Sequence, residues 1–168
     1  GVSVTISRDR EALNAFNDIH DETVKRHAFH RFSRAYMEHE FEAFTPSDSL
    51  FIAQATLADG LVDSAAMIVC YGNMAAYHHG ASLQKQKSTP TSYALQWEAI
   101  QEAKRRGCHW YNFWGTAPEG APASHPFAGL SHFKKGFGGK ERVLVPCHDL
   151  VIDFSYWWKT YPIESLRR

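Results

Sequence analysis

The residues best suited to chemistry lie in the run SHPFAGLSHFKKGFGGK, residues 124–140. Its large apolar side chains recur at three- and four-residue steps, which places them on one face of a helix: Phe127, Leu130, Phe133 and Phe137. Lys134 lies next to that face, and a lysine held beside an aromatic surface is partly desolvated. Such an ammonium can bind an anionic substrate or stabilise a developing oxyanion. A core-packing helix with two solvated lysines is the alternative interpretation.

The same run contains residues that can begin and end the helix. Ser124 can cap its N-terminus, and Pro126 fits the first turn, where a missing N–H costs nothing. Glycines at positions 136, 138 and 139 end it. Because one residue turns a helix by about 100°, Lys135 falls further from the apolar face than Lys134 does.

Histidines offer a second kind of chemistry. His78 and His79 are adjacent in a predicted strand, where neighbouring side chains point to opposite faces, so at most one of them can enter a given site. Either could accept a proton from an amine nucleophile, and an ordinary strand histidine is the alternative. His27 and His30 lie three residues apart near a helix end. Since no cysteine or carboxylate completes a ligand set at a suitable spacing, the sequence predicts no metal site.

Composition limits the class of protein. With 168 residues, 44% of them hydrophobic, the chain can build one core, and we expect a single domain over 1–168. The three cysteines lie in apolar runs and do not suggest a disulfide framework, so a cytoplasmic location is expected. No apolar run approaches the length of a membrane span. The net charge is zero, which argues against a dedicated binder of DNA.

The first half of the chain predicts a strand, two helices and a three-stranded meander. Val2, Val4 and Ile6 alternate with polar residues, and Ser7 or Asp9 can begin the next helix. The inner face of that helix carries Leu13, Phe16, Ile19, Thr23 and Val24. A second helix from about Arg31 to Phe44 repeats the pattern with Phe32, Tyr36 and Phe41, and Pro46 ends it. The runs LFIAQATL, LVDSAAMIVCY and MAAYHHGA then form antiparallel strands joined by tight turns.

The second half predicts a crossover. A helix over 91–106 should cover the sheet with Tyr93, Trp97 and Ile100, so Trp97 should be buried. The run HWYNFW follows as a strand parallel to the last meander strand, because a helix connects the two. After the helix that carries Lys134, the run ERVLVPCHDLVID reads as a further strand, followed by an aromatic tail.

This order of elements is that of the Gcn5-related N-acyltransferase (GNAT) fold, an α/β (α+β) fold. It predicts a mixed, mostly antiparallel sheet with helices on both faces. The motifs YHHGAS, LQWEAIQEAKRRG, YNFWG and HPFAGLSHFKKGFGG resemble the C-terminal acyltransferase domain of the Fem family. These aminoacyltransferases build the interpeptide bridges of peptidoglycan. The resemblance is close from about residue 77 to 149, and the Phe-Lys helix is its most specific part.

The resemblance implies roles for several residues. Phe133 and Lys134 match family residues that lie by the acyl-transfer centre and stabilise the charge that develops there. Tyr77, Asn112 and Trp114, within the two strand motifs, are predicted to contact substrate. Asn112 stands where the family commonly has Asp. Family enzymes also carry two acyltransferase-like domains, and the sequence predicts one here.

The donor site is predicted at the start of the helix after the meander. Acyl-CoA users of this fold place a glycine-containing loop there, whose backbone N–H groups hold the pyrophosphate. The corresponding stretch, LQKQKSTPTS, has no glycine. A phosphate could still be held by five residues: Lys85, Lys87, Ser88, Thr89 and Thr91. CoA is therefore not favoured as donor, and no tightly bound cofactor is expected. Aminoacyl-tRNA is the donor that the resemblance implies.

These patterns predict an acyltransferase that moves an acyl or aminoacyl group onto an amine, in peptidoglycan or cell-envelope synthesis. His78, His79 or a water would accept the proton of the amine, and Lys134 with backbone N–H groups of residues 77–80 would stabilise the oxyanion. Expected partners are a small-molecule or cell-wall precursor amine, a charged tRNA, and a second copy or second GNAT-like domain. A non-catalytic scaffold half of a two-domain enzyme and an acyl-CoA-dependent N-acetyltransferase are the alternatives.

Overall fold

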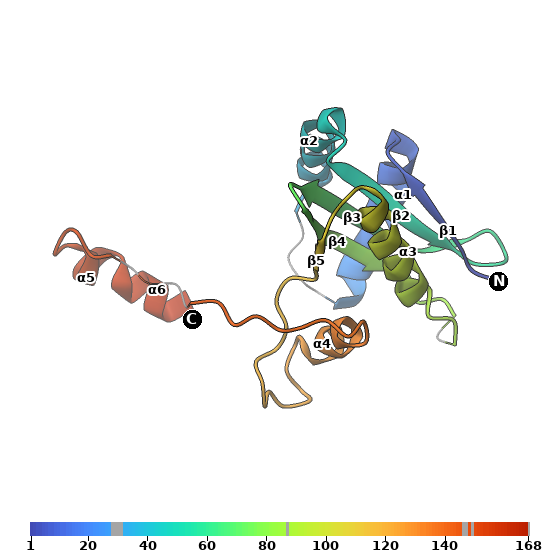
Figure 1. Ribbon diagram of the computed structural model, residues 1–168. Helices are drawn as coiled ribbons and strands as arrows, with labels where there is room; N and C mark the ends of the chain where they lie inside the picture. Colours follow the sequence, from blue (N-terminus) through green and yellow to red (C-terminus); the bar gives the residue numbers. More distant parts are fainter. Residues whose placement is uncertain (28–31, 87, 146–147, 149, 168) are drawn as a thin grey trace. The chain divides into compact units, whose positions relative to one another are not determined.

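A five-stranded sheet organises residues 1–137 (Figure 1). The computed structural model describes residues 1–27, 32–86, 88–145, 148 and 150–167. The strands lie in sequence order: β1 (Ser3–Ser7), β2 (Leu50–Thr56), β3 (Val62–Tyr71), β4 (Met74–Ser82) and β5 (Trp110–Asn112). Neighbouring strands are antiparallel except β4 and β5, which are parallel. The predicted meander and crossover are therefore confirmed.

Helices cover both faces of this sheet, as the sequence predicts (Figure 1). Helices α1 (Arg10–His27) and α2 (Arg34–Phe44) pack on one face, where Phe16, Met37 and Met67 share a buried core. Helix α3 (Thr91–Arg105) packs on the other face, against Phe51 and Ile68. The inner face predicted for the first helix is confirmed at its four buried positions: Leu13, Phe16, Ile19 and Thr23.

Side chains begin both of the first two helices. The Asp9 carboxylate accepts from the backbone N–H of Ala12 at 2.8 Å, and the Ser33 hydroxyl accepts from that of Tyr36 at 3.1 Å. The predicted start of the second helix, Arg31, lies outside the described residues. Helix α2 ends before Pro46, because proline cannot continue the α-helical hydrogen-bond ladder. A short 3₁₀ helix, Thr45–Ser47, contains this proline.

Helix α3 turns a different face to the sheet from the predicted one. Trp97 is 55% exposed, so its predicted burial is wrong. The buried residues form a neighbouring stripe at four-residue steps: Thr91, Leu95, Ala99 and Ala103. They meet the strand alanines 53, 55, 66 and 75. Small side chains on both surfaces let helix and sheet approach closely, and a tryptophan at this interface would not fit.

Helix α4 (Ala128–Lys135) is shorter than the sequence predicts. Phe127 occupies its N-cap position without a side-chain hydrogen bond, so the predicted cap at Ser124 is wrong. The helix ends with Gly136 at its C-cap, whose N–H donates to the carbonyls of His132 and Lys134. The helix is therefore about two turns long, and its buried residues are Ser131 and Lys134.

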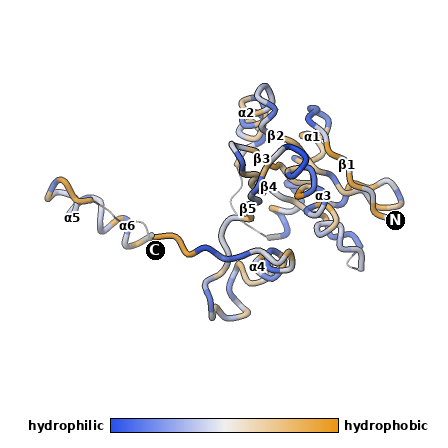
Figure 2. Tube along the Cα trace, viewed as in Figure 1, coloured by the Kyte–Doolittle hydropathy of each residue, from blue (hydrophilic) through white to orange (hydrophobic). Residues whose placement is uncertain are grey.

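The chain divides into two compact units, Gly1–Phe137 and Gly138–Arg168. The single domain expected over 1–168 stays a prediction. The second unit contains α5 (Tyr156–Lys159) and α6 (Tyr161–Arg167). Hydrophobic stretches of this unit show orange along the trace in Figure 2. Several of its apolar side chains are exposed: Val143, Leu144, Val145, Leu150 and Ile152. The run ERVLVPCHDLVID, predicted as a strand, has no strand in its described residues, because no neighbouring strand pairs with it.

No helix within the described residues has both the length and the apolar character needed to cross a bilayer. Cys70 and Cys108 are free thiols, and Cys147 lies outside the described residues.

Candidate functional site

A pocket of about 410 Å³ lies where β4, the residues after β5 and helix α4 meet. Seven residues line it: Tyr77, His78, Gly80, Phe113, Trp114, Leu130 and Lys134. Four of them are predicted site residues, and they come from segments up to 57 positions apart. The sheet and the helix after it therefore bring the predicted lysine, histidine and aromatic residues to one place.

Lys134 is held at this pocket by burial and by one strong hydrogen bond. The residue is 8% exposed, and its Nζ donates to the carbonyl oxygen of Gly115 at 2.6 Å. Burial lowers the pKa of Lys134 from its ordinary value, because a charged ammonium loses hydration there. Lys135 is exposed and does not line the pocket. The predicted difference between the two lysines is thus confirmed in their placement.

Helix α4 is fixed to the loop after β5 by a second contact. The backbone N–H of Ala117 donates to the Ser131 hydroxyl at 2.7 Å, and that hydroxyl donates to the carbonyl of Phe127 at 2.7 Å. Ser131 is therefore occupied in holding the loop, one turn before Lys134.

Tyr77 forms one wall of the pocket and depends on the glycine at position 80. A Cβ built at Gly80 would lie 1.7 Å from the Tyr77 hydroxyl oxygen, so only glycine leaves room for this ring. Burial raises the pKa of Tyr77 to about 12, which keeps the hydroxyl neutral and able to donate a hydrogen bond. The glycine of the YHHGAS motif thus has a steric reason in this fold.

Phe133, predicted beside the transfer centre, is not among the residues that line the pocket. Its ring packs edge-to-face on Tyr93 of α3 at 4.8 Å between centroids, and Phe137 stacks on Phe113 at 5.1 Å. Such aromatic pairs each add about 0.5 to 1.5 kcal/mol beyond burial. Phe133 therefore positions α4 against α3, while Leu130 and Lys134 face the pocket.

Of the other two predicted substrate residues, Trp114 lines the pocket and Asn112 does not. Trp114 lines the pocket with a left-handed backbone, φ 60°. Asn112 does not line it; its side-chain oxygen accepts from the Trp114 N–H at 2.8 Å. A short polar side chain that bonds the backbone two residues on stabilises such a turn. Asn112 thus orients Trp114, a role that an Asp at this position could also fill.

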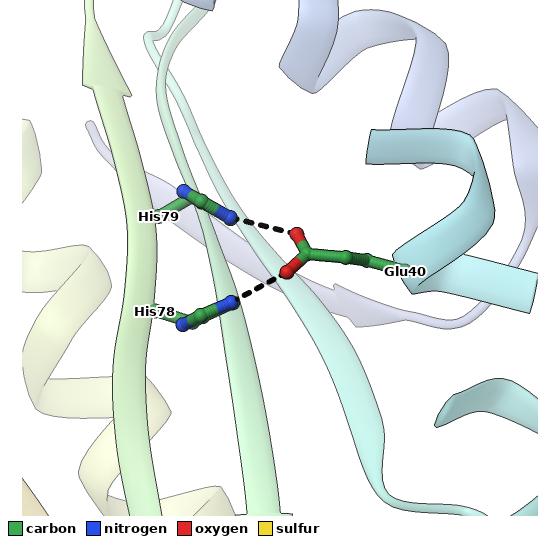
Figure 3. Close-up of side chains that lie close together, drawn as sticks. All are labelled: Glu40, His78 and His79. Atoms are coloured by element: carbon green, nitrogen blue, oxygen red, sulfur yellow. Dashed lines mark hydrogen bonds and ion pairs between the residues drawn. The ribbon is translucent and has the colours of Figure 1, made fainter. Parts of the chain in front are cut away.

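His78 and His79 both approach one carboxylate, which corrects the prediction that only one of them could enter a given site. Nε2 of His78 lies 2.8 Å from one carboxylate oxygen of Glu40, and Nε2 of His79 lies 2.8 Å from the other (Figure 3). The pairing of β3 with β4 shifts here: Met67 is opposite His79, whereas Ile68 is opposite Tyr77. The extra residue, His78, makes a β-bulge, which re-aims side chains that would otherwise alternate.

The carboxylate of Glu40 is charged in this arrangement. Burial pushes its pKa upward, but the hydrogen bonds with His78 and His79 outweigh burial and leave the pKa lowered. Burial lowers the pKa of His79 more than Glu40 raises it, so the His79 ring is neutral at pH 7. Glu40 also raises the pKa of Tyr36, which lies one helical turn earlier on α2. His27 and His30, the other histidine pair of the sequence, cannot be compared: His30 and the side chain of His27 lie outside the described part.

The predicted donor residues at the start of α3 surround an internal carboxylate. Asp63, on β3, is 1% exposed. Its two oxygens accept from the backbone N–H of Lys85 at 2.9 Å and from the Thr91 hydroxyl at 2.6 Å. Thr91 is buried and already bonded, and Thr89 bonds Gln86. Lys85 and Ser88 are exposed, and Lys87 lies outside the described residues.

A second pocket, also about 410 Å³, lies between α3 and β5 and is lined by Lys104, Cys108 and Trp110 among others. It contains none of the predicted site residues. Nearby, burial raises the pKa of the Cys70 thiol to about 12, with a contribution from Cys108, so this thiol is not a nucleophile at neutral pH.

Two residues of these sites were not identified from the sequence. Glu40 lies between the buried Met37 and Phe41 of α2, with Tyr36 one turn earlier, and this spacing could have placed it near the sheet. Asp63 is the one carboxylate in the apolar run LVDSAAMIVCY. A lone carboxylate in a buried strand needs hydrogen-bond donors, so this pattern could have identified Asp63 as a residue with polar partners.

The family model described as the FemAB family matches residues 52–145. A crystal structure of FemX superposes with a TM-score of 0.74 at 18% identity, over 82% of this chain and 50% of that chain. Aminoglycoside N-acetyltransferase AAC(6')-Iy, solved with CoA, gives a TM-score of 0.60 at 16% identity, covering 89% of this chain and 96% of its own. A search of the curated proteins finds no match.

A putative acetyl transferase from Pyrococcus furiosus also superposes, with a TM-score of 0.58 at 15% identity, over 89% of this chain and all of that one. These likenesses confirm the predicted GNAT fold. The chain spans half the length of the FemX chain that it matches, whereas it spans nearly the full length of the acetyltransferases.

Proposed function

Because the chain belongs to the FemAB family, we propose that it transfers an acyl or aminoacyl group to an amine at the pocket around Lys134. The observation that supports this most is the placement of Lys134. Its ammonium is buried and directed by Gly115 at the wall of a pocket that also contains a histidine and a neutral tyrosine. A fixed charge that needs no reorganisation is the kind of group that stabilises an oxyanion.

The reaction requires two chemical tasks from the pocket. The neutral amine attacks the carbonyl carbon of the donor ester, and a C–N bond forms while negative charge collects on the carbonyl oxygen. Lys134, with the Tyr77 hydroxyl and backbone N–H groups of residues 77–80, stabilises that oxygen. The C–O bond of the ester then breaks, and the leaving oxygen takes up a proton. The proton of the amine goes to His78, which lines the pocket, or to a water.

The donor that this chain favours is an aminoacyl ester of tRNA and not acyl-CoA. In acyl-CoA users a helix N-terminus receives the pyrophosphate. Here Asp63 already satisfies the backbone N–H of Lys85 and the hydroxyl of Thr91 at the start of α3. A pyrophosphate at the same place would meet a buried negative charge, and like charges in a poorly hydrated site repel strongly.

The acceptor is a cell-wall precursor amine, held partly by a second domain or a second copy. The chain matches half of the FemX chain, so surfaces that the other half of FemX provides have no counterpart in the matched region. A cytoplasmic location would give the protein access to charged tRNA. A non-catalytic scaffold remains the rival function and is decided by the same experiment.

A binding comparison tests this function. We would measure the thermal unfolding of the protein with CoA, with acetyl-CoA, and with a non-hydrolysable amide analogue of an aminoacylated tRNA acceptor stem. A ligand at a hundred times its dissociation constant should add about 2.7 kcal/mol to the free energy of unfolding. We expect stabilisation by the aminoacyl analogue and no effect of either CoA compound.

The opposite pattern, stabilisation by CoA and acetyl-CoA alone, would assign an acyl-CoA-dependent N-acetyltransferase. No shift with any of the three would favour the scaffold. An uncharged acceptor stem is the matched control, since it separates recognition of the aminoacyl group from attraction to RNA phosphates.

A further inference from the structure

The three side chains of Glu40, His78 and His79 form a cluster of which the acyl-transfer proposal uses only His78. One carboxylate oxygen and two imidazole nitrogens lie within 4.8 Å of one another (Figure 3). They come from α2 and from the bulge of β4, 38 and 39 positions apart in sequence. Two histidines and a carboxylate are a ligand set of catalytic zinc sites, which keep a further position open.

The cluster is semi-enclosed, and one side of it opens to the pocket. The side chains of Glu40 and His79 are each 12% exposed, and that of His78 is 28% exposed. Phe32 packs edge-to-face on His79, with ring centroids 6.0 Å apart, and the ring of Trp114 lies 6.2 Å from that of His78. His78 also lines the pocket of Lys134. A fourth ligand, such as a water, would therefore be supplied from the pocket.

The donor atoms are close enough together to converge on one ion. With bonds of about 2.0 to 2.1 Å, the ligands of a tetrahedral zinc ion lie about 3.3 Å apart. In this structure one carboxylate oxygen of Glu40 lies 2.8 Å from Nε2 of His78, and the other lies 2.8 Å from Nε2 of His79. Rotation of the two rings would bring their nitrogens to this spacing around an ion, while the bulge keeps both rings directed toward Glu40.

The protonation of the cluster suits a cation. The hydrogen bonds with the two histidines keep Glu40 ionised, and burial keeps His79 neutral. Metal ions bind the neutral imidazole and the carboxylate, and they displace the proton between them. Glu40 raises the pKa of Tyr36, so this hydroxyl stays neutral beside the cluster.

We propose that Glu40, His78 and His79 bind one divalent transition-metal ion, of which zinc is the best match to two imidazoles and one carboxylate. This site is separate from the acyl-transfer proposal and does not rest on it. An ion on Nε2 of His78 would shift the ring proton to Nδ1, so neither ring nitrogen could then accept a proton. The two uses of His78 therefore exclude each other.

The test uses the purified protein without a histidine tag and the metal alone. Titration with CoCl2 should give visible absorption bands of a four- or five-coordinate ion that saturate at one equivalent, and ZnCl2 should then displace the cobalt. Glu40→Gln and His79→Gln each remove one ligand and should weaken binding roughly a hundredfold, since even loss of an outer partner costs 10- to 100-fold. Glu38→Gln and His39→Gln, on the same helix, are the matched controls and should bind as the wild type does.

Absence of a saturable cobalt signal would overturn the proposal, as would equal affinity in all four variants. If Glu40→Gln does not fold, X-ray absorption on the cobalt-loaded wild type replaces it. A spectrum with two imidazole ligands supports the site, and one without imidazole overturns it. Because none of these readouts involves transfer, they stand or fall independently of the enzyme's donor.

Discussion

The pocket around Lys134 and the start of α3 both present polar residues, but only the pocket leaves them available to a substrate. At the pocket, Lys134 has one protein partner at its Nζ, and His78 and Tyr77 border the same space. At the start of α3, Thr91 and the N–H of Lys85 are both bonded to Asp63. The first region can bind a substrate group, whereas the second has already satisfied its donors internally.

The comparison of the pocket with the start of α3 shows that residue types alone do not identify a binding site. Lys85, Ser88, Thr89 and Thr91 have the composition of a phosphate site, and the helix after them has a suitable N-terminus. A buried carboxylate 22 and 28 positions away in sequence determines how that end is used. An internal anion replaces the external one, and the electrostatic reason to bind a phosphate disappears.

The largest expected effect belongs to Lys134. Lys134→Met keeps most of the side-chain stem and removes the charge, so turnover should fall roughly a hundredfold or more, as on loss of one oxyanion donor. Folding should change little, because the Gly115 carbonyl is exposed and can bond water. Transfer assays with the donor selected by the binding comparison measure this. Lys135→Met is the control, and equal losses in both variants would mean that no specific contact matters.

Asp63 should have the largest effect on stability at the second region. Asp63→Ala leaves the Thr91 hydroxyl and the Lys85 N–H without their acceptor, and each hydrogen bond to a charged group contributes about 1.5 to 3 kcal/mol. We expect a loss of roughly 3 kcal/mol in the free energy of unfolding, measured by urea denaturation. Lys85→Met, which keeps the backbone N–H, should be near neutral. An unchanged urea midpoint for Asp63→Ala would show that the hydrogen bonds of Asp63 do not stabilise the start of α3.

The pH dependence of stability distinguishes a desolvated Lys134 from a solvated one. Its pKa is lowered in the folded state, so between that pKa and the ordinary value the unfolded chain binds more protons. The free energy of unfolding should therefore rise with pH in the wild type relative to Lys134→Met. This gain is complete above the unfolded pKa and disappears as pH falls through the folded one. Parallel curves for the two proteins at alkaline pH would indicate a solvated lysine.

The smallest effect is expected at Trp97, on the side of α3 turned away from Asp63. Because its side chain is largely exposed, Trp97→Ala should change the free energy of unfolding by only about 0.5 kcal/mol. Leu95→Ala is the positive control, since Leu95 is 2% exposed and such truncations cost about 2 to 5 kcal/mol. A large loss at Trp97 would mean that the face carrying Thr91 is not the buried one.

Helix α3 shows why periodicity predicted the element but not its orientation. The helix has two apolar stripes, one with Tyr93, Trp97 and Ile100 and one with Leu95, Ala99 and Ala103. Aromatic size favours the first stripe in a sequence-based ranking. The sheet beneath α3 is rich in alanine, and close packing against it selects the stripe with small residues. Which stripe is buried depends on the partner surface, which lies elsewhere in the chain.

Local sequence patterns were enough to predict most of the helices and strands and the position of Lys134 on its helix. Turn residues set the meander, helical periodicity set the inner face of α1, and the 100° step between residues separated Lys134 from Lys135. These are short-range properties, fixed by backbone geometry within a few residues. Contacts between residues far apart in sequence depend on the tertiary structure. The bulge that turns both His78 and His79 toward Glu40 arises from the register of β3 against β4, and Asp63 reaches the start of α3 through sheet packing. Such contacts follow from the packing of whole elements, for which one sequence carries no local signal.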